Sequence, residues 1–72
     1  MYQTDQELSV RNAVVADKAG KAAIAQGHTD FDLSRVSVVD SVAVAVMLGW
    51  QRTAKNAGKS LTFHAIPASL IS

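Results

Sequence analysis

The chain of 72 residues contains no cysteine, which excludes disulfide bonds, thiolate metal sites and a cysteine nucleophile. It also lacks an excess of charge of one sign, because seven Lys and Arg residues stand against six Asp and Glu residues. This balance argues against a polybasic nucleic-acid-binding protein and against an acidic tail. Hydrophobic residues make up 49% of the chain, which together with the low net charge argues against disorder. We therefore expect one small domain over residues 1–72, with the marginal stability typical of this length.

Long hydrophobic runs and export signals are also missing. The longest apolar run covers residues 42–48 and is about a third of the length that a membrane-spanning helix needs. The first seven residues are polar and include Asp5 and Glu7, where a signal peptide carries lysines and then an apolar run. We therefore expect a soluble cytoplasmic protein with no membrane insertion.

The segment from Val10 to Gln26 has the composition of a helix, because it is rich in alanine, the strongest helix former. Asn12 is a candidate N-cap, and Gly27 is a candidate C-terminal stop. Gly20 weakens the middle of this helix. The inward stripe is expected to comprise Val14, Ala22 and Ile24, with Ala13 and Ala19 allowing close packing.

A second helix is predicted to begin at about Ser41 and to end near Gly58, with Asp40 or Ser41 as its cap. We expect Trp50 to pack in the core or to be half-buried. Arg52, Lys55 and Asn56 are expected to lie toward water. The residues that follow helical spacing, and that are expected to form its apolar stripe, are Val44, Met47, Leu48, Gln51 and Ala54.

Short segments of alternating polarity predict strands. They cover residues 29–33, 38–39 and 61–65, with a weaker candidate at 7–10. Pro67 is placed to start a third helix, whose first turn is 68–71. Strands that alternate with helices predict an α/β protein with a mostly parallel sheet of about four strands, covered by two to three helices.

Asp40 and Ser41, together with His64, are the residue types of a serine hydrolase. No Gly-x-Ser-x-Gly sequence surrounds Ser41, and a chain of this length has little room for a substrate pocket. Gly58-Lys59-Ser60 is similar to the end of a phosphate-binding loop, but the upstream glycine is missing. We therefore interpret Ser41 as a helix cap and Gly58 as a helix stop, and we expect no enzymatic activity.

His28, Asp30 and Asp32 recur at every second residue and would share one face of a strand. Their side chains suit a divalent ion, but neighbours on one strand face lie about 7 Å apart, too far to converge on one ion. We interpret them as a solvated sheet face, and we predict no metal ion and no cofactor.

The block Phe31-Asp32-Leu33-Ser34-Arg35-Val36-Ser37-Val38-Val39-Asp40-Ser41, followed by residues 44–48, resembles the central motif of STAS domains (sulfate transporter and anti-sigma factor antagonist). The similarity continues through residues 55–61 to 67–70 and covers roughly residues 7–71. The resemblance implies a STAS-like α/β fold without catalytic residues. STAS domains are usually longer, so it also implies a core trimmed at both ends, with an exposed sheet edge and low stability or self-association.

Within that family the chain looks most like the MlaB-type subunits of Mla phospholipid transport systems. This branch binds the cytoplasmic ATPase of an ABC transporter and supports its assembly and activity. The resemblance implies that the loop from Ser37 to Asp40 and the start of the second helix face the partner, with Ser41 at the hydroxyl position. The implied partner-binding residues are Ser37, Val39, Asp40, Ser41, Val42 and Val44.

The alternative branch is that of the anti-sigma factor antagonists, whose signature is Asp-Ser-Ser-Gly. A partner kinase phosphorylates the second serine of that signature, and the added charge breaks the complex. This chain has Val42 at the second position and Ala43 in place of the glycine. Ser41 is then the one candidate phosphorylation site that remains in the motif.

Overall fold

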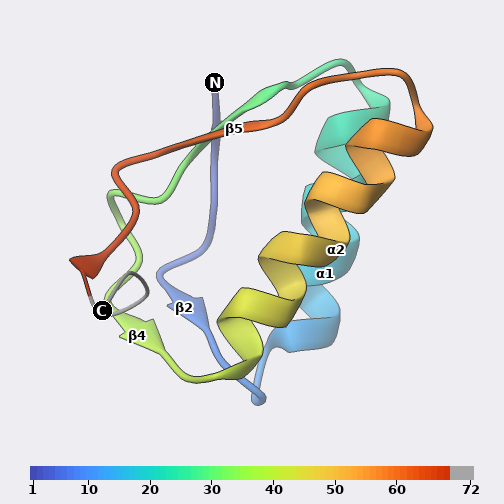
Figure 1. The fold of residues 1–72 in the computed structure, drawn as a ribbon. Helices are drawn as coiled ribbons and strands as arrows, with labels where there is room; N and C mark the ends of the chain where they lie inside the picture. Colours follow the sequence, from blue (N-terminus) through green and yellow to red (C-terminus); the bar gives the residue numbers. More distant parts are fainter. Residues whose placement is uncertain (69–72) are drawn as a thin grey trace.

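The computed structural model describes residues 1–68, which form two helices and five short strands (Figure 1). The predicted α/β class is confirmed, and the two predicted helices are present. The predicted third helix after Pro67 lies almost wholly outside the described residues. In chain order the elements are β1 (Tyr2–Gln3), β2 (Glu7–Leu8), α1 (Ala13–Ala25), β3 (Asp30–Asp32), β4 (Val38–Val39), α2 (Val42–Asn56) and β5 (Thr62–His64).

All described strand pairs are parallel. They form a three-stranded sheet in the order β1-β3-β5 and a two-stranded sheet of β2 and β4, rather than the single sheet expected. Parallel pairing needs long crossover connections, and α1 and α2 supply them. Backbone bonds continue each pairing beyond the strand ends, because Thr4 N–H donates to Asp32 O at 3.2 Å beside β1 and β3, and Ser37 N–H donates to Gln6 O at 2.8 Å beside β2 and β4.

The strand β1 is absent from the sequence prediction. Its two residues, Tyr2 and Gln3, pair with Phe31 and Asp32 of β3. Two polar-flanked residues are too few to show an alternating pattern. The pairing therefore depends on the tertiary contact of Tyr2, whose ring centroid lies 4.8 Å from that of Phe31.

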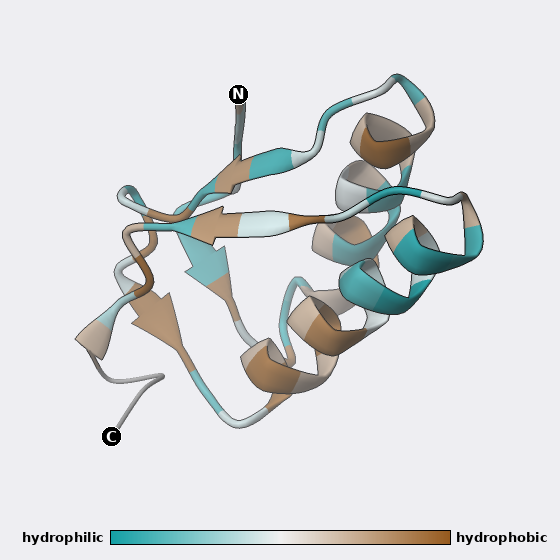
Figure 2. Ribbon diagram, turned by 45° about the horizontal axis from the view of Figure 1, so that its top comes forward, coloured by the Kyte–Doolittle hydropathy of each residue, from teal (hydrophilic) through white to brown (hydrophobic). Residues whose placement is uncertain are grey.

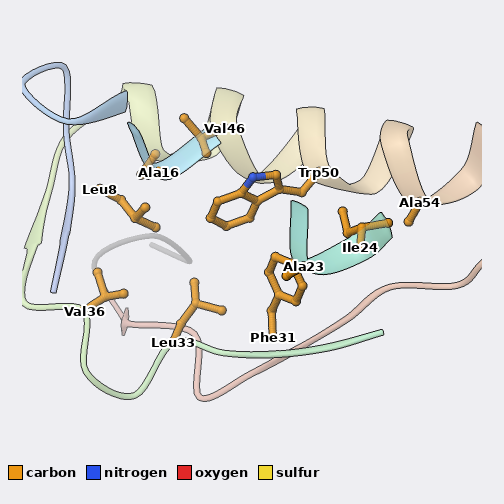
Figure 3. Packing of buried hydrophobic residues seen from close by; sticks show 11 residues of the cluster. Leu8, Ala16, Ala23, Ile24, Phe31, Leu33, Val36, Val46, Trp50 and Ala54 are labelled. Carbon is orange, nitrogen blue, oxygen red and sulfur yellow. The ribbon is translucent and has the colours of Figure 1, made fainter. Parts of the chain in front are cut away.

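The two helices pack side by side on one side of the strands (Figures 1 and 2). Trp50 is the largest core side chain and is 1% exposed, as expected for a core residue. Its ring meets that of Phe31 edge to face, with centroids 5.1 Å apart. Figure 3 shows the indole pointing from α2 toward Phe31 and Leu33, with Leu8 on one side and Ile24 on the other.

The predicted inward stripe of α1 is only partly correct. Ile24 is buried, but Val14 is 67% exposed and Ala22 is exposed as well. The buried face consists of Ala16, Gly20, Ala23 and Ile24. Alanines occur all around this helix, so the spacing of its apolar residues does not single out one face.

The predicted stripe of α2 is largely wrong. Val44, Leu48 and Gln51 are exposed, Met47 is half-buried, and Ala54 is the one member that is fully buried. The helix has apolar residues on two faces, and the face that carries the large indole turns inward because it buries more apolar area. The buried face consists of Ala43, Val46, Trp50 and Ala54.

Both helices end as predicted. Gly27 follows α1 with φ +99° and Gly58 follows α2 with φ +74°, a conformation that favours glycine and closes a helix. Within residues 1–68, neither helix combines the length and the apolar content needed to cross a bilayer.

Candidate functional site

The carboxylate of Asp40 joins the starts of the two helices. Its Oδ1 accepts from the backbone N–H of Val42 at 2.9 Å, and its Oδ2 accepts from the backbone N–H of Val10 at 3.0 Å. The first of these bonds satisfies an N–H group that the helix leaves open, and the negative charge suits the positive end of the α2 dipole. Of the two predicted caps, Asp40 is therefore the one whose side chain acts.

Ser41 occupies the N-cap position of α2, but its side chain makes no capping hydrogen bond. The residue is exposed to solvent. The side chain of Asp40 caps the helix instead, so the Ser41 hydroxyl at the helix start is not used for capping. The prediction that Ser41 itself caps the helix through its side chain is wrong.

The structure brings the other predicted partner-binding residues to this same end of α2. Ser37 and Val44 are exposed, whereas Val39 and Val42 are half-buried and pack against the core. Only part of the predicted surface therefore presents side chains to solvent. The exposed part comprises Ser37, Asp40, Ser41 and Val44.

Two exposed valines beside this site were missed by the sequence prediction. Val10 is 71% exposed and Val38 is 50% exposed, close to the 46% of Val44. Val10 is bonded through its backbone to Asp40, and Val38 lies two residues before Asp40 on β4. We call Val10, Val38 and Val44 the apolar end surface, and Figure 2 shows the hydrophobic colour on β4 and on the first turns of α2.

A signal for one of these valines was present in the sequence. In a strand of two valines, successive side chains point to opposite faces, so one of Val38 and Val39 had to face away from the core. The exposure of Val10 could not be read in this way, because it belongs to the turn that precedes α1.

His64 is paired with a residue other than Ser41. Its Nε2 lies 2.8 Å from Oδ1 of Asp30, and both side chains are about half exposed. Ser41 follows β4 in the other sheet, and Asp40 is occupied by two backbone donors. The described contacts therefore do not assemble a Ser-His-Asp arrangement of the kind that acyl transfer needs.

His28, Asp30 and Asp32 have separate contacts, and the ring of His28 lies beside that of Tyr2, with centroids 6.3 Å apart. Asp30 pairs with His64, while Asp32 accepts from Ser34 N–H at 2.9 Å and from Gln3 Nε2 at 3.3 Å. The bond from Ser34 N–H is the main reason why the pKa of Asp32 lies below its ordinary 3.8. Among residues 1–68, no group of three or more His, Asp or Glu side chains is arranged to hold a metal ion.

Lys59, in the sequence that is similar to a phosphate-binding loop, has a structural contact instead. Its Nζ donates to the carbonyl oxygen of Ile24 at 2.8 Å. Ile24 lies in the last turn of α1, and its carbonyl oxygen also accepts from the Gly27 N–H at 3.0 Å. The helix stop itself is shown by Gly58, whose φ is +74°.

The geometry defines a small parallel α/β domain with an exposed helix start and the apolar end surface beside it. The family model of the Mlab, STAS domain matches residues 6–72. The chain therefore belongs to the STAS family, in its MlaB-type branch, whose members are in general non-catalytic interaction domains. No curated protein and no solved structure shows significant similarity to the chain.

Proposed function

We propose that the chain is a cytoplasmic, non-catalytic subunit that binds the ATPase of an Mla-type phospholipid ABC transporter. The MlaB-type family match supports this proposal. The observation that carries it is the exposed Ser41 at the start of α2, whose side chain makes no capping hydrogen bond. A partner that reaches this point also meets the exposed side chain of Val44, one turn further along α2.

The exposed valines and the Ser41 hydroxyl would contribute to binding in different ways. Covering the apolar end surface removes three valine side chains from water, at about 25 cal/mol per Å² of apolar area. The Ser41 hydroxyl then supplies a hydrogen bond beside Val44, where a group without a partner is costly once it is covered. A charge placed at Ser41 would have to be desolvated on binding, and it would lie next to the carboxylate of Asp40.

The test is co-purification of the chain with the ATPase subunit. Ser41→Asp is expected to abolish the complex while the circular dichroism spectrum of the domain stays unchanged. Ser60→Asp adds the same charge at an exposed position outside both helices and is expected to bind like the wild type. Unchanged co-purification of Ser41→Asp would reject the proposal.

A second variant tests the contribution of the exposed valines to binding separately from that of the Ser41 hydroxyl. Val44→Asp places a charge on an exposed side chain of the apolar end surface and is expected to weaken binding without unfolding. Val42 is unsuitable for this purpose, because it packs against the core.

The alternative function is that of an anti-sigma factor antagonist in a partner-switching pathway. The exposure of Ser41 favours it, because a kinase could reach the hydroxyl. Incubation with a purified anti-sigma kinase followed by mass spectrometry decides between the two. Absence of phosphate on Ser41 would rule the alternative out.

A further inference from the structure

The outer surface of the two helices carries a shallow groove. It is lined by Ala13, Val14 and Asp17 of α1 and by Ala45 and Val46 of α2, with a volume of about 280 Å³. Small side chains in such a groove allow close approach of another helix. Gly49 adds to this, because it lies on α2 beside Asp17 and has no side chain.

Large apolar side chains on the two helices are left uncovered. Val14, which lines the groove, is 67% exposed. Leu48 does not line the groove, but it follows the lining residue Ala45 by one helical turn and is 55% exposed. Val44, at 46%, also belongs to the apolar end surface at the start of α2. Together they extend the exposed apolar area from the candidate site along the helices, as expected for an interaction surface.

Charge is distributed unevenly between the helices and the rest of the chain. The helices carry four cations and one carboxylate, a net charge of +3, whereas the remaining residues carry three cations and five carboxylates, a net charge of −2. The single carboxylate, Asp17, is ion-paired with Lys21 at 2.9 Å. The helix cations are Lys18, Lys21, Arg52 and Lys55.

Along each helix, an exposed valine lies near the N-terminus and a lysine lies toward the C-terminus. Val14 and Val44 belong to the first turn of their helices, whereas Lys21 and Lys55 lie toward the other end. The two helices run side by side in the same direction (Figure 1), and Figure 2 shows α2 changing from hydrophobic to hydrophilic colour toward its C-terminus. The groove therefore lies at the apolar, N-terminal end of the two helices, and Lys18 and Arg52 lie beyond its lining residues toward the C-terminal ends.

We propose that this groove binds an amphipathic helix of the partner ATPase that carries Asp or Glu residues. Its apolar side chains would cover Val14 and Leu48, and its carboxylates would lie near Lys18 and Arg52. A helix fits better than a strand, because two helices offer ridges and grooves but no free backbone edge. The inference rests on the proposed function and adds a second contact to the one at Ser41.

The first test measures affinity for the purified ATPase with a matched pair of apolar variants. Leu48→Asp is expected to weaken binding by roughly tenfold or more, because it puts a charge into the apolar contact. Val15→Asp introduces the same charge at a residue that is 63% exposed, and it is expected to bind like the wild type. Leu48 is a helical neighbour (i+3) of the lining residue Ala45, whereas Val15 is neither a lining residue nor three or four positions from one.

The second test concerns charge. The double variant Lys18→Glu/Arg52→Glu is expected to weaken binding and to flatten its dependence on salt, because the attraction it removes is screened by ions. Arg35→Glu, on an exposed loop outside the helices, is expected to keep the salt dependence of the wild type.

The third test identifies the occupant. The chain has no cysteine, so Val14→Cys gives a single site for a thiol-linked photo-cross-linker. Mass spectrometry of the cross-linked ATPase is expected to find an acidic amphipathic helix. Cross-linking to a strand or to a basic segment would overturn the inference.

The outcomes are distinguishable from those of the proposed function. If the wild-type chain does not bind the ATPase, both proposals fail. If Ser41→Asp abolishes binding but Leu48→Asp and the charge reversal bind normally, the groove inference alone is overturned. If sedimentation shows that Leu48→Asp dissociates a dimer of the chain while ATPase binding stays unchanged, the groove is a self-association surface and the inference is also overturned.

Discussion

The indole of Trp50 lies directly over Gly20, where a Cβ atom would come within 2.2 Å of Nε1 and 2.3 Å of Cε2. The indole N–H also donates to the carbonyl oxygen of Asp17 at 3.2 Å. Gly20 is therefore the point at which α1 lets the largest core side chain of α2 approach. A glycine that weakens the helix by itself allows the two helices to pack.

Gly20→Ala is expected to destabilise the domain by roughly 1–3 kcal/mol, because the added methyl group overlaps a rigid ring in the core. Alanine is a better helix former than glycine, so helix propensity alone would make Gly20→Ala stabilising. Destabilisation would therefore identify the packing against Trp50 as the larger effect. Gly49→Ala is the matched control, since its Cβ would lie 3.8 Å from Asp17 Oδ1. It is expected to stabilise by up to about 1 kcal/mol. Thermal unfolding measures the stability of both variants. Stabilisation by Gly20→Ala would contradict the close packing of Trp50 on Gly20.

Asp40→Ala is expected to cost about 1 kcal/mol of unfolding free energy, as is typical for loss of a helix N-cap. Because the carboxylate serves two backbone donors, the amide hydrogens of both Val10 and Val42 should exchange faster with solvent. Asp40→Asn keeps one acceptor oxygen and should recover part of the loss. Faster exchange at Val42 alone would show that the two helix starts are not joined.

Tyr2 is the only tyrosine in the chain, so the absorbance of tyrosinate reports a single group. Burial, with a smaller contribution from the charge of Asp5, raises the pKa of Tyr2 above its ordinary 10.0. The folded state thus holds this proton more tightly than the unfolded state, so its contribution to stability is complete below pH 10 and falls as the pH rises further. A titration midpoint at or below 10.0 in the folded protein would disagree with the packing of Tyr2 against Phe31.

Lys59→Met is expected to destabilise by about 1 kcal/mol, because it removes a charged donor from the C-terminal end of α1. The measurement is urea unfolding. Lys18→Met, at an exposed position within α1, is expected to stay within about 0.5 kcal/mol of the wild type. Equal stability of Lys59→Met and Lys18→Met would mean that the contact with Ile24 contributes nothing.

Element positions were predictable because they depend on local signals. The glycines at 27 and 58 stop the helices, and the alternating residues 30–32 and 62–64 form strands, within one or two residues of the predicted bounds. The inward faces were less predictable, since apolar residues occur on more than one side of each helix. Trp50 decides the face of α2, and its packing partner Gly20 lies 30 residues earlier in the chain.

The candidate site was predicted as a segment, but not in its details. The motif predicts a loop over 37–40 followed by the start of a helix, and the structure has β4 at Val38–Val39 and the start of α2 at Val42. The contact between Asp40 and Val10 could not be foreseen, because it joins two turns that meet only when β2 and β4 pair. Val10 and Val38 enter the surface for the same reason.

The parallel pairing of the strands has a consequence for the speed of folding. Each described pair joins residues about thirty positions apart, such as Tyr2 with Phe31 and Phe31 with Phe63. No described strand can therefore pair with its neighbour through a tight turn. During folding, each pair forms only after a loop of about thirty residues has closed, which costs conformational entropy. We expect slower folding than that of a helical bundle of similar length, with the helices gaining structure before the sheets.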